Sequence, residues 1–123
     1  MMKTTITFIF ALFLFLNISG QGNNIESIEE LVAQGTALHD QGKYAEAIKK
    51  YKAALKADKN SPLANYEIAY TYLSMGKYDD AIKHSEKVIN LNGNYQHIAY
   101  VVMGSAWTSK AKRAMLLKFM KKD

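Results

Sequence analysis

The 123-residue chain contains no cysteine, one proline and one tryptophan. Without cysteine the chain has no disulfide framework, no thiolate metal site and no cysteine nucleophile. The seven glycines form neither a Gly-rich phosphate loop nor the sharp turn that presents a catalytic serine. These absences remove the common sequence signatures of catalysis, and we expect no enzyme activity and no cofactor.

Side chains at metal-binding spacing are also missing. None of His39, His84 and His97 is followed at the third or fourth position by a residue that would complete a helical metal pair. Asp79 and Asp80 are adjacent, so on a helix they point about 100° apart. Acids in a first helical turn are already explained by the helix dipole. We therefore expect no metal site, and we place the histidines on the surface or in a groove.

The chain has no apolar run long enough to span a bilayer comfortably. Its N-terminal run, residues 6–16, is shorter than the roughly 20 residues that a transmembrane helix needs. Lys3 precedes this run, and small or polar residues follow it over 17–22, which is the order of a secretory signal peptide. We expect residues 1–22 to be a signal peptide cleaved after Gly20 or Gly22, with an uncleaved membrane anchor as the alternative.

Export also sets the expected compartment. A cysteine at the cleavage site would indicate a lipid-anchored lipoprotein, and no cysteine follows the run. Small exported domains of animal cells commonly depend on disulfides, so a disulfide-free exported chain is more natural in a bacterium. We expect the mature protein to be periplasmic or secreted.

The body of the chain contains an internal repeat. The octapeptide GKYAEAIK at residues 42–49 returns as GKYDDAIK at residues 76–83, so that Gly76 follows Gly42 by 34 residues. Apolar residues at helical spacing lie on both sides of each copy. Ser61 and Pro62 form a capping residue and a first-turn proline at the start of the second unit, and residues 92–94 supply left-handed positions that end a helix. Each unit is predicted to be a helix, a tight turn and a helix.

This pattern resembles the tetratricopeptide repeat, whose signature is W-x2-L-G-x2-Y followed by A-x3-F over 34 residues. The match to the first part of the signature lies at Leu31–Gly35–Leu38, at Asn65–Ala69–Tyr72 and at Tyr100–Gly104–Trp107; the match to the second part lies at Ala47–Tyr51 and Ala81–Ser85. The small residues, among them Gly35 and Gly104, are expected where paired helices approach closely. The proline that usually ends each unit is replaced by Lys59 and Gly93.

The resemblance implies an all-α fold, a short right-handed solenoid of antiparallel helix pairs with about two and a half repeats. The repeats are expected over 23–107, as units 28–61 and 62–95 and a partial unit 96–107. Residues 108–123 form a basic C-terminal helix or tail. This segment is interpreted as a closing helix that covers the last repeat. The alternatives are a basic amphipathic helix on an anionic membrane surface, and a chain that is a truncated or frame-altered version of a longer array.

Charge distribution argues against a nucleic-acid partner. The formal net charge is +5, but residues 23–107 hold nine lysines against ten acids, and residues 108–123 hold six basic groups against one acid. The repeat body is therefore close to neutral. Of the eight tyrosines, those at 44, 51, 72 and 78 occupy framework positions and are expected in the core.

In the family that the sequence resembles, function lies on the concave face formed by the first helices, where a peptide or helix docks. The resemblance implies that the matching positions of this sequence line the groove. These are Val32, Thr36, His39, Tyr66, Tyr70, Leu73, Val101 and Val102. Family members that bind the acidic C-termini of chaperones use Lys, Asn and Arg. Here the matching residues are Val32, Thr36, Glu67, Ile98 and Val102. An apolar or mildly basic segment is therefore expected instead, unless these side chains only touch neighbouring helices and the groove is empty.

We accordingly expect a non-catalytic adaptor or assembly factor of the bacterial cell envelope, with another protein or a peptide as its partner. The alternatives are a membrane-surface protein located by residues 108–123, with weak membrane contact there, and an accessory regulator of an envelope enzyme.

Overall fold

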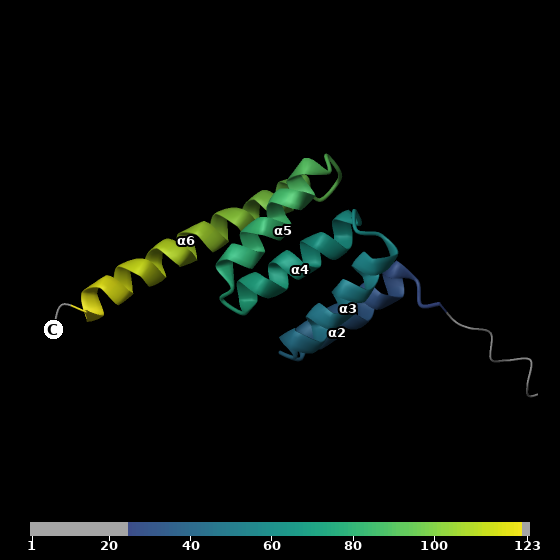
Figure 1. The fold of residues 1–123 in the computed structure, drawn as a ribbon, viewed down its shortest axis with the longest axis horizontal. Coiled ribbons are helices and arrows are strands. Elements are labelled where there is room, and N and C mark those ends of the chain that lie inside the picture. The colour runs from purple at the N-terminus through teal and green to yellow at the C-terminus, as the bar shows by residue number, and fades with distance from the viewer. Residues whose placement is uncertain (1–24, 122–123) are drawn as a thin grey trace, which may run out of the picture.

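The computed structural model describes residues 25–121, and the expected signal peptide lies outside this part of the chain. The described residues form helices and turns, with no strand among them. The helices are α2 (Ile28–Asp40), α3 (Tyr44–Ala57), α4 (Pro62–Ser74), α5 (Tyr78–Asn90) and α6 (Gln96–Met120). α2 pairs with α3, α4 pairs with α5, and α6 packs against α5 and α4 (Figure 1). The predicted all-α repeat architecture is confirmed.

Local sequence explains where the helices begin and end. Ser27 and Glu30 form a reciprocal capping box, in which each side chain accepts a hydrogen bond from the other's backbone N–H, at 3.2 Å and 2.9 Å. Ser61 Oγ accepts from the backbone N–H of Ala64, and Pro62 is the first residue of α4, as predicted. Gly42 and Gly76 have φ of 75° and 73°, a left-handed conformation that glycine adopts without strain.

The core lies between the paired helices and follows the repeat framework. Tyr51, Ala47 and Ala81 are fully buried, and Ala69 is only 1% exposed. At Gly35 a Cβ atom would collide with the Tyr51 ring, so α2 and α3 pair as closely as they do only because that residue has no side chain. The expected role of a small framework residue is thus confirmed at Gly35.

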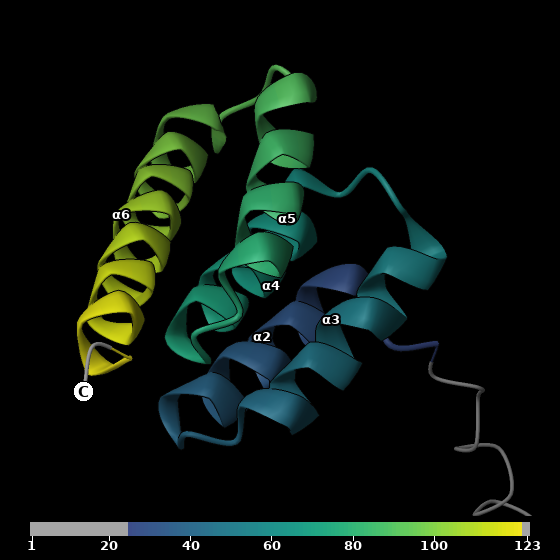
Figure 2. The ribbon, with the colours of Figure 1, turned by 60° about the vertical axis from the view of Figure 1, so that its left-hand side comes forward.

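The third unit differs from the first two, because α6 continues without a break from Gln96 to Met120. The helix passes through the boundary that we expected between residues 107 and 108, and no second helix folds back on it within the described residues (Figure 2). Gly104 was expected at a helix contact, and that expectation is wrong: it is exposed, with no atom within 4 Å of the position a Cβ would take.

Candidate functional site

Five aromatic rings form a continuous row across the first helices, which we call the aromatic row: Tyr44, His39, Tyr70, Tyr66 and Tyr95. Ring centroids are 5.0 Å apart for His39 and Tyr44 (edge-to-face) and 5.1 Å for His39 and Tyr70 (stacked). Stacked pairs continue the row, at 6.3 Å for Tyr66 and Tyr70 and at 5.9 Å for Tyr66 and Tyr95. The row therefore joins α2, the start of α3, α4 and the residue before α6.

Hydrogen bonds and packing hold the row in place. His39 Nδ1 lies 2.8 Å from the hydroxyl of Thr71, a buried residue of α4. This contact fixes the imidazole between the Tyr44 and Tyr70 rings. Tyr70 is still 42% exposed as a residue, so the row presents an aromatic surface to solvent. A surface of pre-stacked rings gives a partner large apolar contact area with little further loss of side-chain entropy.

Acidic side chains border the row. Burial raises the pKa of Glu67, and the Asp40 carboxylate adds to that rise. Burial also raises the pKa of Tyr66, helped by Glu67 and Tyr70. Both shifts disfavour the ionised forms of these two side chains, and a positive group placed beside Glu67 would relieve the cost of its charge.

Of the eight residues predicted for the groove, four lie in the row or beside it. His39, Tyr66 and Tyr70 belong to the row itself, and Thr36 lies one helical turn before His39, its hydroxyl donating to the Val32 carbonyl at 3.0 Å. Leu73 is half-buried and packs against the core. Whether these residues bind a partner stays a prediction.

The predicted valines fall in different environments. Val32 and Val102 are each only 4% exposed and belong to the core, so they offer almost no surface to a partner. Val101 is 67% exposed, on α6. The helical period explains the difference, since adjacent residues on α6 point in directions about 100° apart.

Sequence reasoning missed two members of the row, Tyr44 and Tyr95. Tyr44 was expected in the core, but it is half-buried, with its ring against His39. Tyr95 has no aromatic counterpart in the preceding unit, where Ser61 stands 34 residues earlier. No repeat pattern could therefore have indicated it.

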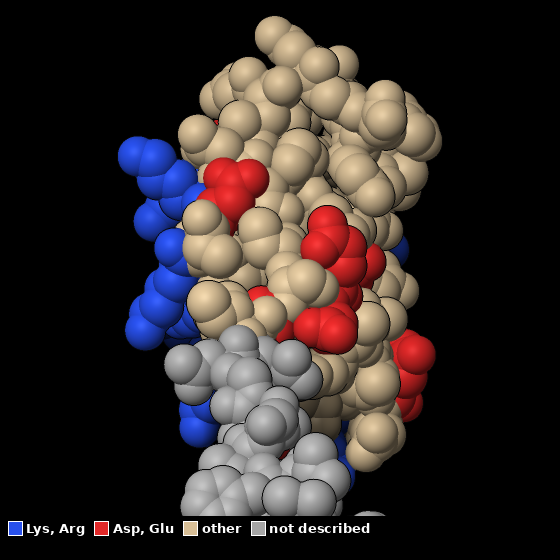
Figure 3. Space-filling view, turned by 90° about the vertical axis from the view of Figure 1, so that its right-hand side faces the viewer, with Lys and Arg blue, Asp and Glu red and all other residues tan. Residues whose placement is uncertain are grey.

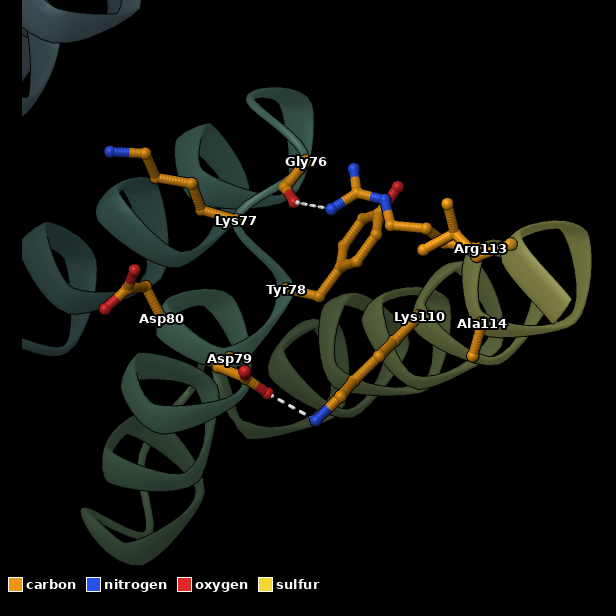
Figure 4. Close-up of a pocket in the computed structure, with 9 residues that line it drawn as sticks. Gly76, Lys77, Tyr78, Asp79, Asp80, Lys110, Arg113 and Ala114 are labelled. Atoms are coloured by element: carbon orange, nitrogen blue, oxygen red, sulfur yellow. Dashed lines mark hydrogen bonds and ion pairs between the residues drawn. The ribbon is translucent and has the colours of Figure 1, made fainter. Parts of the chain in front are cut away.

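A second feature lies where the second half of α6 passes the start of α5. A hollow of about 450 Å³ opens between them (Figure 4). Lys110 Nζ lies 2.6 Å from Asp79 Oδ1, Arg113 Nη1 donates to the Gly76 carbonyl at 3.1 Å, and the guanidinium lies 4.5 Å from the Tyr78 ring centroid. These polar contacts attach the middle of α6 to the second repeat.

Surface charge is mixed on the end from which the chain enters α2. There, Lys and Arg atoms gather along one edge, and Asp and Glu atoms lie over the middle (Figure 3). The described residues contain no group of three or more His, Asp or Glu side chains that could hold a metal ion. Within them, no helix has the length and apolar character needed to cross a membrane.

Comparison with known proteins is consistent with this geometry. The family model described as "TPR repeat" matches residues 35–76, and the one described as "Tetratricopeptide repeat" matches residues 63–95. A solved structure, "Second TPR of Spaghetti (RPAP3) bound to HSP90 peptide SRMEEVD", is 30% identical with a TM-score of 0.64. That match covers 73% of this chain and 82% of the other.

Curated relatives include the chicken (Gallus gallus) "DnaJ homolog subfamily C member 3", 34% identical over 60% of this chain. Another is the Cryptococcus neoformans "Tetratricopeptide repeat and J domain-containing co-chaperone DNJ1", 29% identical over 71% of this chain. The chain spans only 14% and 17% of the length of these two relatives.

Proposed function

Because this chain belongs to the tetratricopeptide repeat family, we propose that it is a non-catalytic adaptor that docks a segment of another protein on its aromatic row. The family builds extended binding surfaces from stacked helix pairs. A solved neighbour was captured with a peptide bound, which supports a peptide as the partner here.

The observation that carries this proposal is the row itself. Five rings contact one another in series, three of the four pairs being stacked, yet Tyr70 remains 42% exposed at the centre of the row. Tyrosine and other aromatic residues are enriched among the side chains that dominate binding energy, especially where they lie near the centre of an interface. We assign Tyr70 as the central anchor, with Tyr66 and His39 beside it.

Charge indicates what kind of segment the row would accept. Glu67 is half-buried, and its pKa is raised by burial and by the nearby Asp40 carboxylate, so a positive group would stabilise its ionised form. A lysine or arginine in the partner would satisfy these carboxylates, and an apolar or aromatic side chain would cover the rings. The EEVD end of the peptide bound by the solved neighbour would bring further carboxylates beside Glu67, so this chain is expected to disfavour such an end.

We further propose that the protein works in a bacterial cell envelope. Support comes from the first 22 residues, in which Lys3, an apolar run and small residues follow one another in signal-peptide order. The mature protein should then begin at Gln21 or Asn23 and fractionate outside the cytoplasm. Envelope protein that retains Met1 would contradict cleavage.

A peptide selection tests the docking proposal without knowledge of the natural partner. A random peptide library is displayed and selected on the immobilised chain, in parallel with the Tyr70→Ala variant. We expect wild-type selection to enrich peptides that combine an aromatic or aliphatic residue with Lys or Arg, and we expect the variant to lose this enrichment. Enrichment of acidic C-termini, or equal enrichment on both proteins, would contradict the proposal.

A further inference from the structure

The outward face of α6 carries apolar side chains that no described helix covers. α6 contacts α5 and α4 through Ala99, Val102 and Ala106, which are buried. The opposite face holds an apolar series at helical spacing, which we call the outer stripe: Tyr100, Gly104, Trp107, Ala111 and Met115. Tyr100, Trp107 and Met115 are 52%, 53% and 58% exposed. In Figures 1 and 2, this helix lies at the edge of the molecule with neighbours on one side only.

Alignment with the first repeat indicates which kind of element packs on this face. Tyr100, Gly104 and Trp107 stand where the first unit has Leu31, Gly35 and Leu38. In that unit the ring of Tyr51, on the following helix, fills the space beside Gly35. Beside Gly104 there is nothing within 4 Å, since α6 continues straight on where the unit's second helix would have turned back. Within residues 25–121, the outer stripe is thus a helix-pairing face with no helix packed on it.

The outer stripe is complementary to itself when two copies run antiparallel. Pairing about the point between residues 107 and 108 sets Gly104 opposite Ala111 and Tyr100 opposite Met115. Small residues then face small ones, which lets the backbones approach, and large apolar residues face large ones. The methionine sulfur opposite a tyrosine ring is a favourable contact.

The distribution of basic residues along α6 also favours the antiparallel pairing. Residues 96–109 of α6 contain no Lys, Arg, Asp or Glu, whereas Lys110, Lys112, Arg113 and Lys118 lie in the second half. An antiparallel pair places each basic half beside an uncharged half of the partner. A parallel pair would set the four basic residues of one copy against those of the other, at a cost in repulsion.

We propose that the chain forms a symmetric dimer in which the α6 of a second copy packs antiparallel on the outer stripe, in the place that a second helix takes in the first two units. The two bodies lie on opposite sides of the helix pair, because α5 and α4 contact the other face of α6. This interface is separate from the aromatic row, so a failure of either proposal leaves the other standing.

Cysteine crosslinking tests the pairing and its direction, against a natural background that contains no cysteine. Gly104→Cys and Ala111→Cys are made in separate full-length chains. Under mild oxidation we expect a disulfide dimer when the two variants are mixed, and little when either is oxidised alone. Efficient crosslinking of each variant with itself would indicate a parallel pair and overturn the proposal, as would no crosslinking in any combination.

Oligomeric state provides the second test, with a matched pair of variants. Light scattering on the wild-type chain should give twice the monomer mass, which is 13.8 kDa for all 123 residues, and Trp107 emission should shift to shorter wavelength as concentration rises. Gly104→Lys should abolish both effects, because it sets a charge in the centre of the seam at a site with no steric conflict in the monomer. Ser105→Lys, exposed one residue away, should change neither.

Salt separates this dimer from other occupants of the face. Added salt screens the repulsion between the basic α6 helices, so it should strengthen this dimer. Added salt should weaken binding of α6 to anionic lipid or to an acidic helix. A monomeric wild-type chain that sediments with anionic vesicles at low salt would overturn the proposal in favour of a membrane surface. A dimer that survives Gly104→Lys would overturn it in favour of another interface.

Discussion

The ring of Tyr51 on α3 lies against the bare backbone of Gly35 on α2, and a Cβ atom at Gly35 would fall 2.8 Å from the ring's Cδ1. Burial raises the pKa of Tyr51, whose hydroxyl lies close to Thr36 and Thr71 without the geometry of a hydrogen bond. Burial thus favours the neutral form of the Tyr51 phenol. The first helix pair packs closely around its ring.

Two glycine-to-alanine variants should have opposite effects on stability. Gly35→Ala forces the Tyr51 ring to move and should lower the free energy of unfolding by about 1–3 kcal/mol, the usual cost of overpacking. Gly104→Ala meets open space in the monomer and should raise it by about 0.5–1 kcal/mol through helix propensity. Denaturant unfolding at low protein concentration measures both, and equal effects would contradict the packing described for α2 and α3.

The second repeat can be tested in the same manner at Ala81. This residue is fully buried between helices, so Ala81→Leu should overpack the second repeat and destabilise it by roughly 1–3 kcal/mol. Lys49→Leu places the same side chain at an exposed position of α3 and should be close to neutral. An unchanged melting temperature for Ala81→Leu would mean that the helix pairing is wrong.

Stability should depend on pH through His84. Burial lowers its pKa below the ordinary 6.5, and Lys83 and Lys87 contribute to the shift. The unfolded chain then binds a proton more readily than the folded one, so stability is full above pH 6.5 and falls as pH drops through the folded pKa. His84→Gln should flatten this decline in melting temperature. His97→Gln, at an exposed site, should leave the decline as it is in the wild type.

The C-terminal half of α6 should depend on Arg113 for its order. Its guanidinium donates to the Gly76 carbonyl and lies over the Tyr78 ring, whereas residues 110–120 are otherwise exposed. Arg113→Ala should speed amide hydrogen exchange over residues 114–120 and change the melting temperature little. Lys112→Ala, an exposed neighbour, serves as the control. Equal exchange in the two variants would show that the contact with Gly76 does not hold the helix.

The sequence predicted the repeat units well because their signals are local. The turns at Gly42 and Gly76, the cap at Ser61 and the small residue at Gly35 each act within one helix or helix pair, and each was confirmed. The third unit was harder to predict. Its first-helix motif is intact at Tyr100 and Gly104, but nothing in that motif determines whether a second helix follows.

The candidate site was predicted only in part, for a related reason. The family pattern indicates which sequence positions line a groove, but it does not indicate how deeply each side chain is buried. It therefore could not show that Val32 and Val102 are buried while Val101 is exposed. It also could not place Tyr95, which joins the aromatic row from the turn before α6. Stacking between rings on separate helices depends on how the units pack, and packing is set by residues far apart in sequence.

The central claim is that the aromatic row binds a protein segment, with Tyr70 as its main anchor. Calorimetric titration of a selected basic-aromatic peptide into the wild-type chain, Tyr70→Ala and Phe119→Ala tests it most directly. Phe119 is an exposed aromatic far along α6 and so controls for the loss of any ring from the surface. Circular dichroism of each variant checks that helical content is retained.

We expect Tyr70→Ala to weaken binding by at least about 1 kcal/mol, the level that separates anchors from bystanders, with helical content unchanged and with Phe119→Ala binding as the wild type does. Equal affinity for all three proteins, with the fold intact, would contradict the claim and place the binding surface elsewhere.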